Sequence, residues 1–187
     1  YPAIPLEKAR DHVSHGSAAL IKLGFGQHQE EAGYRSRIER FLHNYRQSLS
    51  VDSRLFDGME MLLDQLENRQ IRWGVVTNKP AWLTDPLMEE LNLHQRAACI
   101  ISGDSVAERK PHPLPMLTAT QRAKVDPQHT LYLGDASRDI EAGNAAGMLT
   151  LIANWGYIDA SQTPETWGAD GFLDHPMDCI QWLKPAL

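Results

Sequence analysis

The chain has 187 residues, of which 42% are hydrophobic and 22% charged, enough for one full domain with a modest appendage. Its formal net charge of -6, with no cluster of Lys and Arg, argues against a nucleic-acid partner, because neutralising phosphates needs clustered cations. No apolar run approaches the roughly 20 residues of a membrane span and no signal-peptide pattern opens the chain, so we expect a cytoplasmic protein without a membrane partner.

The first 50 residues carry apolar residues at helical spacing and no strand signal. Residues 24–27 include two glycines and predict a turn. The polar break at Ser14, His15 and Gly16 interrupts the first helix, and it is either an ordinary corner or a loop that faces a ligand. We therefore predict a small helical domain over residues 1–52.

From residue 53 onward, short apolar runs alternate with helical patterns, which indicates an α/β domain over residues 53–187. Right-handed crossovers at this spacing predict a doubly wound, mostly parallel sheet. Pro86 lies inside one helical pattern and should kink that helix or mark its restart. The predicted strands are 71–76, 97–102, 131–133, 149–153 and 171–173, and the predicted helices are 59–68, 82–91, 114–125, 137–147 and 176–183.

The two cysteines, Cys99 and Cys179, are too few for a disulfide framework and lack the spacing of a zinc site. We expect both to be plain apolar side chains.

Residues 130–147, TLYLGDASRDIEAGNAAG, combine a buried strand, a Gly-Asp stop and a helix of small residues. Asp135 falls at the carboxyl end of the strand, where ligands bind in open α/β sheets, and Asp139 falls in the first turn of the helix. Two carboxylates placed in this way can converge on Mg²⁺, which prefers oxygen ligands. The alternative is a helix-capping aspartate followed by a first-turn charge that complements the helix dipole.

Polar groups follow two other strands. Thr77 and Asn78 follow the strand that ends at Val76, and Lys110 lies in the loop after the next strand. A hydroxyl, backbone amides and an ammonium are the groups that hold a phosphate. Taken singly, Thr77 is better explained as a helix cap and Lys110 as a solvated loop lysine, but together these polar groups favour a phosphate site.

Three segments resemble motifs of the haloacid dehalogenase (HAD) superfamily of phosphohydrolases, in the right order and separation. VVTNKP is similar to its second motif, ERKPHPLP to its third and GDASRD to its fourth. The resemblance covers roughly residues 55–175, and residues 1–50 are similar to the mobile helical cap of the phosphoglycolate phosphatase branch. The Thr-Asn-Lys tripeptide favours a phosphatase over a dehalogenase or a mutase.

The resemblance implies a role for each polar residue. Thr77 and Asn78 would hold the transferring phosphoryl group, Lys110 would stabilise its charge, and Asp135 would coordinate Mg²⁺ with Asp139 nearby. In the cap, His15 and Gly16, together with Ser14, fall where the substrate-contacting loop would be.

The implied function is that of a magnesium-dependent phosphomonoester hydrolase that works through an aspartyl phosphate. Its substrate would be a small phosphorylated metabolite, either phosphoglycolate or a sugar phosphate such as N-acetylmuramic acid 6-phosphate. We expect a monomer or a homodimer.

One family motif has no counterpart in the sequence. Family members begin with a strand that ends in Asp-x-Asp-Gly-Thr, whose first aspartate attacks phosphorus and whose second acts as acid and base. We expect an upstream segment to supply this strand, and we expect the 187 residues alone not to turn over substrate. The alternative is a non-catalytic phosphate-binding or interaction module of the same fold.

Overall fold

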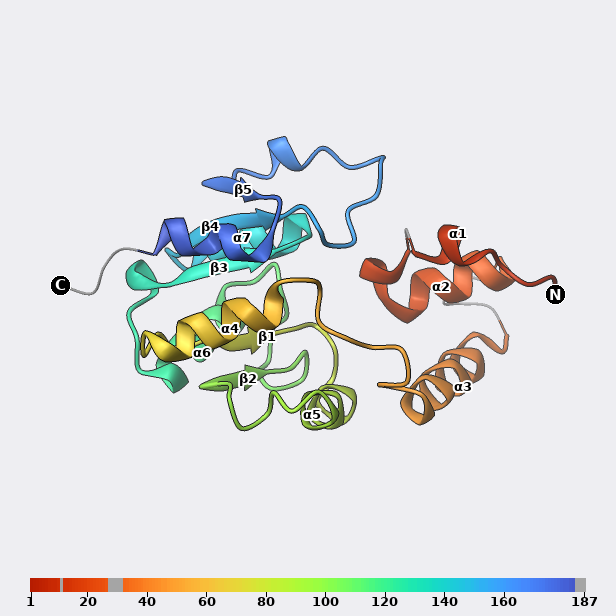
Figure 1. Cartoon of the computed structure of the whole chain (residues 1–187). Coiled ribbons are helices and arrows are strands. Elements are labelled where there is room, and N and C mark those ends of the chain that lie inside the picture. The colour runs from red at the N-terminus through yellow and green to blue at the C-terminus, as the bar shows by residue number, and fades with distance from the viewer. Residues whose placement is uncertain (11, 27–31, 184–187) are drawn as a thin grey trace. The chain divides into compact units, whose positions relative to one another are not determined.

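The computed structural model describes residues 1–10, 12–26 and 32–183 (Figure 1). The chain forms two compact units. The first contains Tyr1–Asp52 and Tyr157–Gln162, and the second contains Ser53–Gly156 and Thr163–Leu187. The sequence did not lead us to expect residues 157–162 in the first unit.

The first unit is helical. Its elements are α1 (Leu6–Arg10), the 3-10 turn η1 (Val13–His15), α2 (Gly16–Phe25) and α3 (Tyr34–Gln47). The turn predicted from residue 24 begins later, because α2 continues to Phe25 and ends at Gly26, whose left-handed φ of 67° allows its N–H to donate to Lys22 O. Gln27, the last residue of that predicted turn, lies outside the described residues.

The second unit is an α/β structure in which all strand pairs are parallel, as predicted. Its strands form two sheets, β1-β2 and β3-β4-β5. The elements are α4 (Met59–Asn68), β1 (Gly74–Val76), α5 (Ala81–Glu90), β2 (Cys99–Ile101), α6 (Leu114–Ala123), η2 (Pro127–His129), β3 (Leu131–Gly134), α7 (Ser137–Ala145), β4 (Leu149–Ala153), η3 (Pro164–Thr166), β5 (Gly171–Leu173) and η4 (Pro176–Trp182).

The register shows which strands lie next to each other. Val75 pairs with Ile100 in the first sheet, and Leu133 pairs with Leu151 in the second. Within the described residues, β1 and β3 do not pair with each other or through another strand. Each of them therefore has one edge without a strand partner in the described part of the chain. The sequence predicted one sheet, and the division into two falls between β1 and β3.

Apolar side chains pack on both sides of the strands, as expected where helices cover both faces of a sheet. One cluster joins α4 and η4 to β4 and β5 through residues such as Leu62, Cys179, Leu151 and Leu173. The other joins α6 and α7 through Met116, Ala142, Ala146 and Met148, with Val76 and Tyr132 packed against it. Cys179 is thus a buried apolar side chain, and Cys99 is half-buried and unpaired.

Two elements differ from the sequence prediction. Helix α5 is one continuous helix across Pro86, so the predicted restart is wrong. The C-terminal helix is a 3-10 helix, η4, which begins with a capping box between His175 and Asp178.

None of the helices in the described residues combines the length and apolar character that a bilayer span requires.

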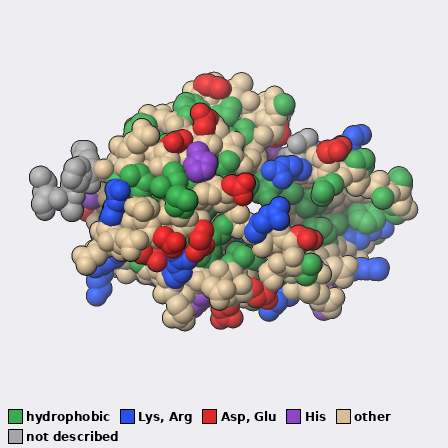
Figure 2. Space-filling view, viewed as in Figure 1, with side chains coloured by type: hydrophobic (Ala, Val, Ile, Leu, Met, Phe, Trp, Pro, Cys, Tyr) green, Lys and Arg blue, Asp and Glu red, His purple; other side chains and the backbone are tan. Residues whose placement is uncertain are grey.

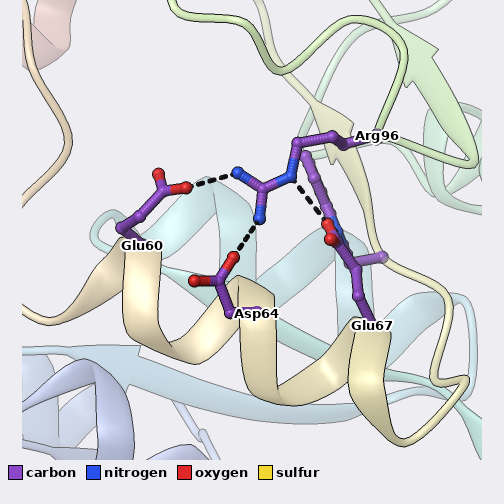
Figure 3. A network of polar contacts seen from close by, with 5 residues as sticks. Glu60, Asp64, Glu67 and Arg96 are labelled. Carbon is purple, nitrogen blue, oxygen red and sulfur yellow. Dashed lines mark hydrogen bonds and ion pairs between the residues drawn. The ribbon is translucent and has the colours of Figure 1, made fainter.

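Arg96 ties the segment before β2 to helix α4 (Figure 3). Its guanidinium donates to Glu60, to Asp64 Oδ1 at 2.7 Å and to Glu67 Oε1 at 2.9 Å, three carboxylates on successive turns. Hydrogen bonds to Glu67 and Glu60 raise the pKa of Arg96. This network positions α4 and lies apart from the strand ends that carry the predicted site.

Candidate functional site

Thr77 directly follows β1. Its N–H donates to Ile101 O at 2.9 Å, which extends the β1-β2 pairing by one residue, and its hydroxyl accepts from Lys79 N at 3.1 Å. The helix that follows, α5, has Pro80 as its N-cap residue. The interpretation of Thr77 as a helix cap is therefore wrong, and its hydroxyl lies in the turn at the carboxyl end of β1.

Asn78 binds the main chain of Lys110 at two points. Its Nδ2 donates to Lys110 O at 3.0 Å, and its Oδ1 accepts from Lys110 N at 3.1 Å. The two bonds fix the loop after β2, including the cis peptide between Lys110 and Pro111, against the end of β1. The side chain of Asn78 thus acts directly on the placement of Lys110.

The Lys110 side chain is only 7% exposed, so the solvated-lysine interpretation is wrong. Its ammonium donates to Val76 O at 2.7 Å and to Tyr132 Oη at 2.8 Å, and it forms an ion pair with Asp139 Oδ1 at 2.8 Å. Burial lowers the pKa of Lys110, but the interactions with Tyr132 and Asp139 outweigh it and raise the pKa above its usual value. Lys110 is therefore a buried, charged group.

Tyr132 is a site residue that the sequence analysis missed, because it was counted as an apolar residue of the strand. Its hydroxyl accepts from Lys110 and donates to Val76 O at 3.2 Å, which connects the two sheets. Burial raises the pKa of Tyr132 to about 12. The available signal was chemical: a tyrosine in a buried strand needs a partner for its hydroxyl.

Asp139 is 5% exposed and lies in the first turn of α7, where the helix dipole favours a negative charge. Its Oδ1 accepts no hydrogen bond from the described residues and meets Lys110 as an ion pair. Gly134 makes this position possible, since a Cβ atom there would lie 2.3 Å from the Cβ of Asp139. The buried acid and the buried lysine are thus one unit.

Asp135 follows β3 directly and is half-buried. The N-cap residue of α7 is Ala136, without a side-chain cap bond, so Asp135 is not the cap that the alternative interpretation required. Gly156, after β4, lies against it: a Cβ atom on Gly156 would be 2.3 Å from Asp135 Cβ. The carboxylate is held at the carboxyl edge of β3 by this close packing.

The carboxylates of Asp135 and Asp139 are oxygen donors of the kind that Mg²⁺ takes, and Mg²⁺ binds through one or two carboxylates because it keeps several waters. No group of three or more His, Cys, Asp or Glu side chains in the described residues is arranged to hold a metal. Asp135 and Asp139 therefore fit Mg²⁺ in the chemistry of their oxygen donors, and no group of three such side chains forms around them in the described residues.

His15 and Gly16 lie in the helical unit. His15 Nε2 is 3.9 Å from Asp159 Oδ2, and the Ser14 hydroxyl donates to Tyr157 O at 3.2 Å. His15 lines a cavity of about 340 Å³ together with His12, Asp159, Ala160 and Ser161. Gly16 begins α2 with a left-handed φ of 77°.

Hydrogen bonds from Gln162 and Ser161, with a smaller effect of His15, lower the pKa of Asp159 to about 2.

On the face viewed in Figure 2, Lys and Arg side chains lie scattered among acidic and apolar ones.

Comparison with known proteins shows which family the chain resembles. Residues 2–153 match the family model described as haloacid dehalogenase-like hydrolase. A phosphoglycolate phosphatase from Xanthomonas campestris pv. campestris is 41% identical over 187 residues, covering 98% of this chain and 84% of that protein. An N-acetylmuramic acid 6-phosphate phosphatase from Pseudomonas putida is 37% identical over 186 residues, covering 100% of this chain and 83% of that protein. The crystal structure of a predicted phosphoglycolate phosphatase from Haemophilus somnus 129PT superposes with a TM-score of 0.85 at 22% identity, covering 98% of this chain and 84% of that one, which shows a shared fold.

Proposed function

This chain belongs to the haloacid dehalogenase-like hydrolase family, and from that premise we propose that it acts as a magnesium-dependent phosphatase on small phosphorylated metabolites. The observation that carries the proposal is Lys110: a buried ammonium at the carboxyl ends of the parallel strands, beside the Thr77 turn and Asp139. Burying a charge is costly unless it is paired, and Asp139 pairs with Lys110 here. Its place at the carboxyl ends of parallel strands, where ligands bind in open α/β sheets, supports a role in binding an anionic phosphoryl group.

In the proposed site Lys110 supplies the positive charge for a phosphoryl oxygen. Its ammonium now contacts a carbonyl, a hydroxyl and a carboxylate. The hydroxyl of Tyr132 is a neutral acceptor for Lys110 and itself donates to Val76 O. A phosphoryl oxygen would therefore replace the contact between Lys110 and Tyr132. Asn78 keeps the Lys110 main chain in place during that exchange, and the hydroxyl and amides of the Thr77 turn add hydrogen bonds to the phosphoryl group.

The carboxylates of Asp135 and Asp139 would hold Mg²⁺, Asp135 directly and Asp139 from beside Lys110. When bound, Mg²⁺ would neutralise charge on the phosphoryl oxygens. Lys110 limits what Asp139 can contribute, because one of its oxygens already faces the ammonium. Asp135 is accordingly the residue on which metal binding should depend most.

The nucleophile and the acid/base are proposed to come from an Asp-x-Asp-Gly-Thr segment, a motif that the 187 residues do not contain. The edges of β1 and β3, which lack a strand partner within the described residues, support the idea that this segment adds a strand there. Its first aspartate would attack phosphorus in line, and its second would protonate the leaving alcohol and then activate water. The 187 residues alone would then bind phosphate and not turn over substrate.

The names of the two relatives suggest the substrate: phosphoglycolate or a sugar phosphate such as N-acetylmuramic acid 6-phosphate. We propose that the helical unit acts as the cap that selects between them, with His15 and Gly16 as ligand-contacting residues.

The test is phosphate release from both compounds in the presence of Mg²⁺, by the protein with the Asp-x-Asp-Gly-Thr segment present. We expect release of inorganic phosphate from at least one of them. Binding of a phosphorylated compound without release of phosphate would instead identify a non-catalytic phosphate-binding module.

A further inference from the structure

The helical unit contains two pieces of chain that are far apart in sequence. Residues 157–162 follow β4 and the loop that ends at Gly156, yet they belong to the same compact unit as residues 1–52. The hydrogen bond from Ser14 to Tyr157 O spans 143 positions in the sequence. The turn around His15 is therefore in contact with a segment that begins 143 residues after Ser14 in the sequence.

Three contacts connect this segment to the turn. The Arg10 guanidinium lies 4.7 Å from the ring centroid of Tyr157, a cation–π contact. Ser14 donates to Tyr157 O at 3.2 Å, and His15 Nε2 lies 3.9 Å from Asp159 Oδ2. These contacts fall on α1 and η1, on the N-terminal side of α2 and within six residues of one another.

Asp159 is held independently of His15. Its Oδ1 accepts from Ser161 N at 2.8 Å and from the Ser161 hydroxyl, and its Oδ2 accepts from Gln162 Nε2 at 2.6 Å. Its side chain is 14% exposed, whereas that of His15 is 50% exposed. The carboxylate is thus the fixed partner and the imidazole the adjustable one, and the 3.9 Å contact between them is an ion pair when His15 is protonated.

Both imidazoles of the cavity have an identifiable orientation. His12 Nδ1 lies 3.0 Å from Lys8 O, and because a carbonyl only accepts, Nδ1 carries the proton. His15 directs Nε2 toward the Asp159 carboxylate. Both imidazoles line an open surface pocket of about 340 Å³ together with residues 159–161.

We infer that Asp159 is a positioning residue for His15 and that residues 157–162 shape the ligand-contacting surface of the helical unit around His15. This inference rests on the proposed function, since it takes His15 as a ligand-contacting residue. It adds a determinant of substrate selection that lies outside the helical sequence of residues 1–52.

The test compares Asp159→Asn, His15→Ala and the double variant in the enzyme that has its Asp-x-Asp-Gly-Thr segment. The readouts are KM and kcat for N-acetylmuramic acid 6-phosphate and for p-nitrophenyl phosphate. When His15 is protonated, an ion pair of this kind is worth up to about fivefold in an equilibrium constant. We therefore expect Asp159→Asn to raise KM for the sugar phosphate by about twofold to fivefold, with kcat nearly unchanged. The double variant should be no worse than His15→Ala, because Asp159 acts through His15.

The matched control is Asp126→Asn. Asp126 accepts from the N–H two residues ahead, Gln128, at 2.8 Å, as Asp159 does from Ser161, but it lies in the α/β unit. We expect no change in KM. A sugar-phosphate KM for Asp159→Asn equal to that of the wild type, or additive losses in the double variant, would overturn the inference.

A second measurement separates this inference from the proposed function. Amide hydrogen exchange of residues 13–17 in the 187-residue chain should become faster in Asp159→Asn and stay unchanged in Asp126→Asn. If the wild type hydrolyses neither compound, the proposed function fails, and the exchange result alone decides whether Asp159 holds the turn.

Discussion

Replacing Lys110 with methionine tests the buried ion pair. Methionine keeps the apolar stem and removes the charge, which leaves the carboxylate of Asp139, 5% exposed, without its cation. Breaking a buried pair by removing one partner costs about 3–5 kcal/mol, against a total stability of about 5–15 kcal/mol for a typical domain. Lys110→Met should therefore remove a large share of the free energy of unfolding of the α/β unit.

The assay is urea unfolding of the 187-residue chain near neutral pH. With a urea m-value of about 2 kcal/mol/M, the midpoint should fall by about 2 M. The double variant Lys110→Met/Asp139→Asn should recover at least half of the loss, because no uncompensated buried charge remains. Lys124→Met, at an exposed lysine just after α6, is the control and should change stability by less than about 0.5 kcal/mol.

A loss below about 1 kcal/mol for Lys110→Met would refute this reasoning, since that is the size expected of a solvent-exposed pair. Failure of the double variant to recover stability would show that the loss comes from the hydrogen bonds of Lys110 to Val76 O and Tyr132 Oη and not from the ion pair.

Two further predictions concern stability. The folded-state pKa values of Lys110 and Tyr132 are raised, that of Tyr132 to about 12, so their contribution is complete below the unfolded-state values near 10 and is lost as the pH rises through the folded-state values. The free energy of unfolding measured in urea should thus fall by about 1 kcal/mol or more between pH 10 and 11. The fall should be smaller in Tyr132→Phe. An equal fall in the two proteins would contradict the raised pKa of Tyr132. Gly156→Ala should lower Tm by about 5 °C, because the new Cβ atom would collide with Asp135. The control is Gly24→Ala, whose Cβ atom would lie at an ordinary contact distance of 3.5 Å from Ile4 and should not lower Tm. Equal Tm values for the two variants would argue against close packing of Gly156 on Asp135.

The sequence was sufficient for the order of elements and for the strand ends that carry polar residues. Alternating short apolar runs and helical patterns define parallel strands, and a residue directly after such a run, such as Thr77 or Asp135, must lie at the carboxyl edge. This placement depends only on local pattern and chain direction.

The direction of the side chains could not be read from the sequence. Whether Lys110 points to solvent or inward depends on Val76, Tyr132 and Asp139, which come from separate elements. Tyr132 fits an apolar pattern and a polar role equally well, because its ring is apolar and its hydroxyl is not. The membership of residues 157–162 in the helical unit depends on contacts with Arg10, Ser14 and His15, which have no local signature.

The proposed magnesium site depends most on Asp135. The control for Asp135→Asn is Asp174→Asn. Asp174 follows β5 of the same sheet, and its Oδ1 accepts a hydrogen bond from Asn154 Nδ2 at 2.7 Å. Neither Asp→Asn exchange changes the size of the side chain appreciably, so a difference between the two variants reports the site and not the fold.

The measurement that tests the central claim is the rate of phosphate release from a small phosphomonoester, with and without Mg²⁺, by the enzyme containing the Asp-x-Asp-Gly-Thr segment. We predict hydrolysis that requires Mg²⁺, a loss of at least about 100-fold in Asp135→Asn, and a rate close to that of the wild type in Asp174→Asn. An Asp135→Asn enzyme with the wild-type rate and Mg²⁺ dependence would contradict the proposed site.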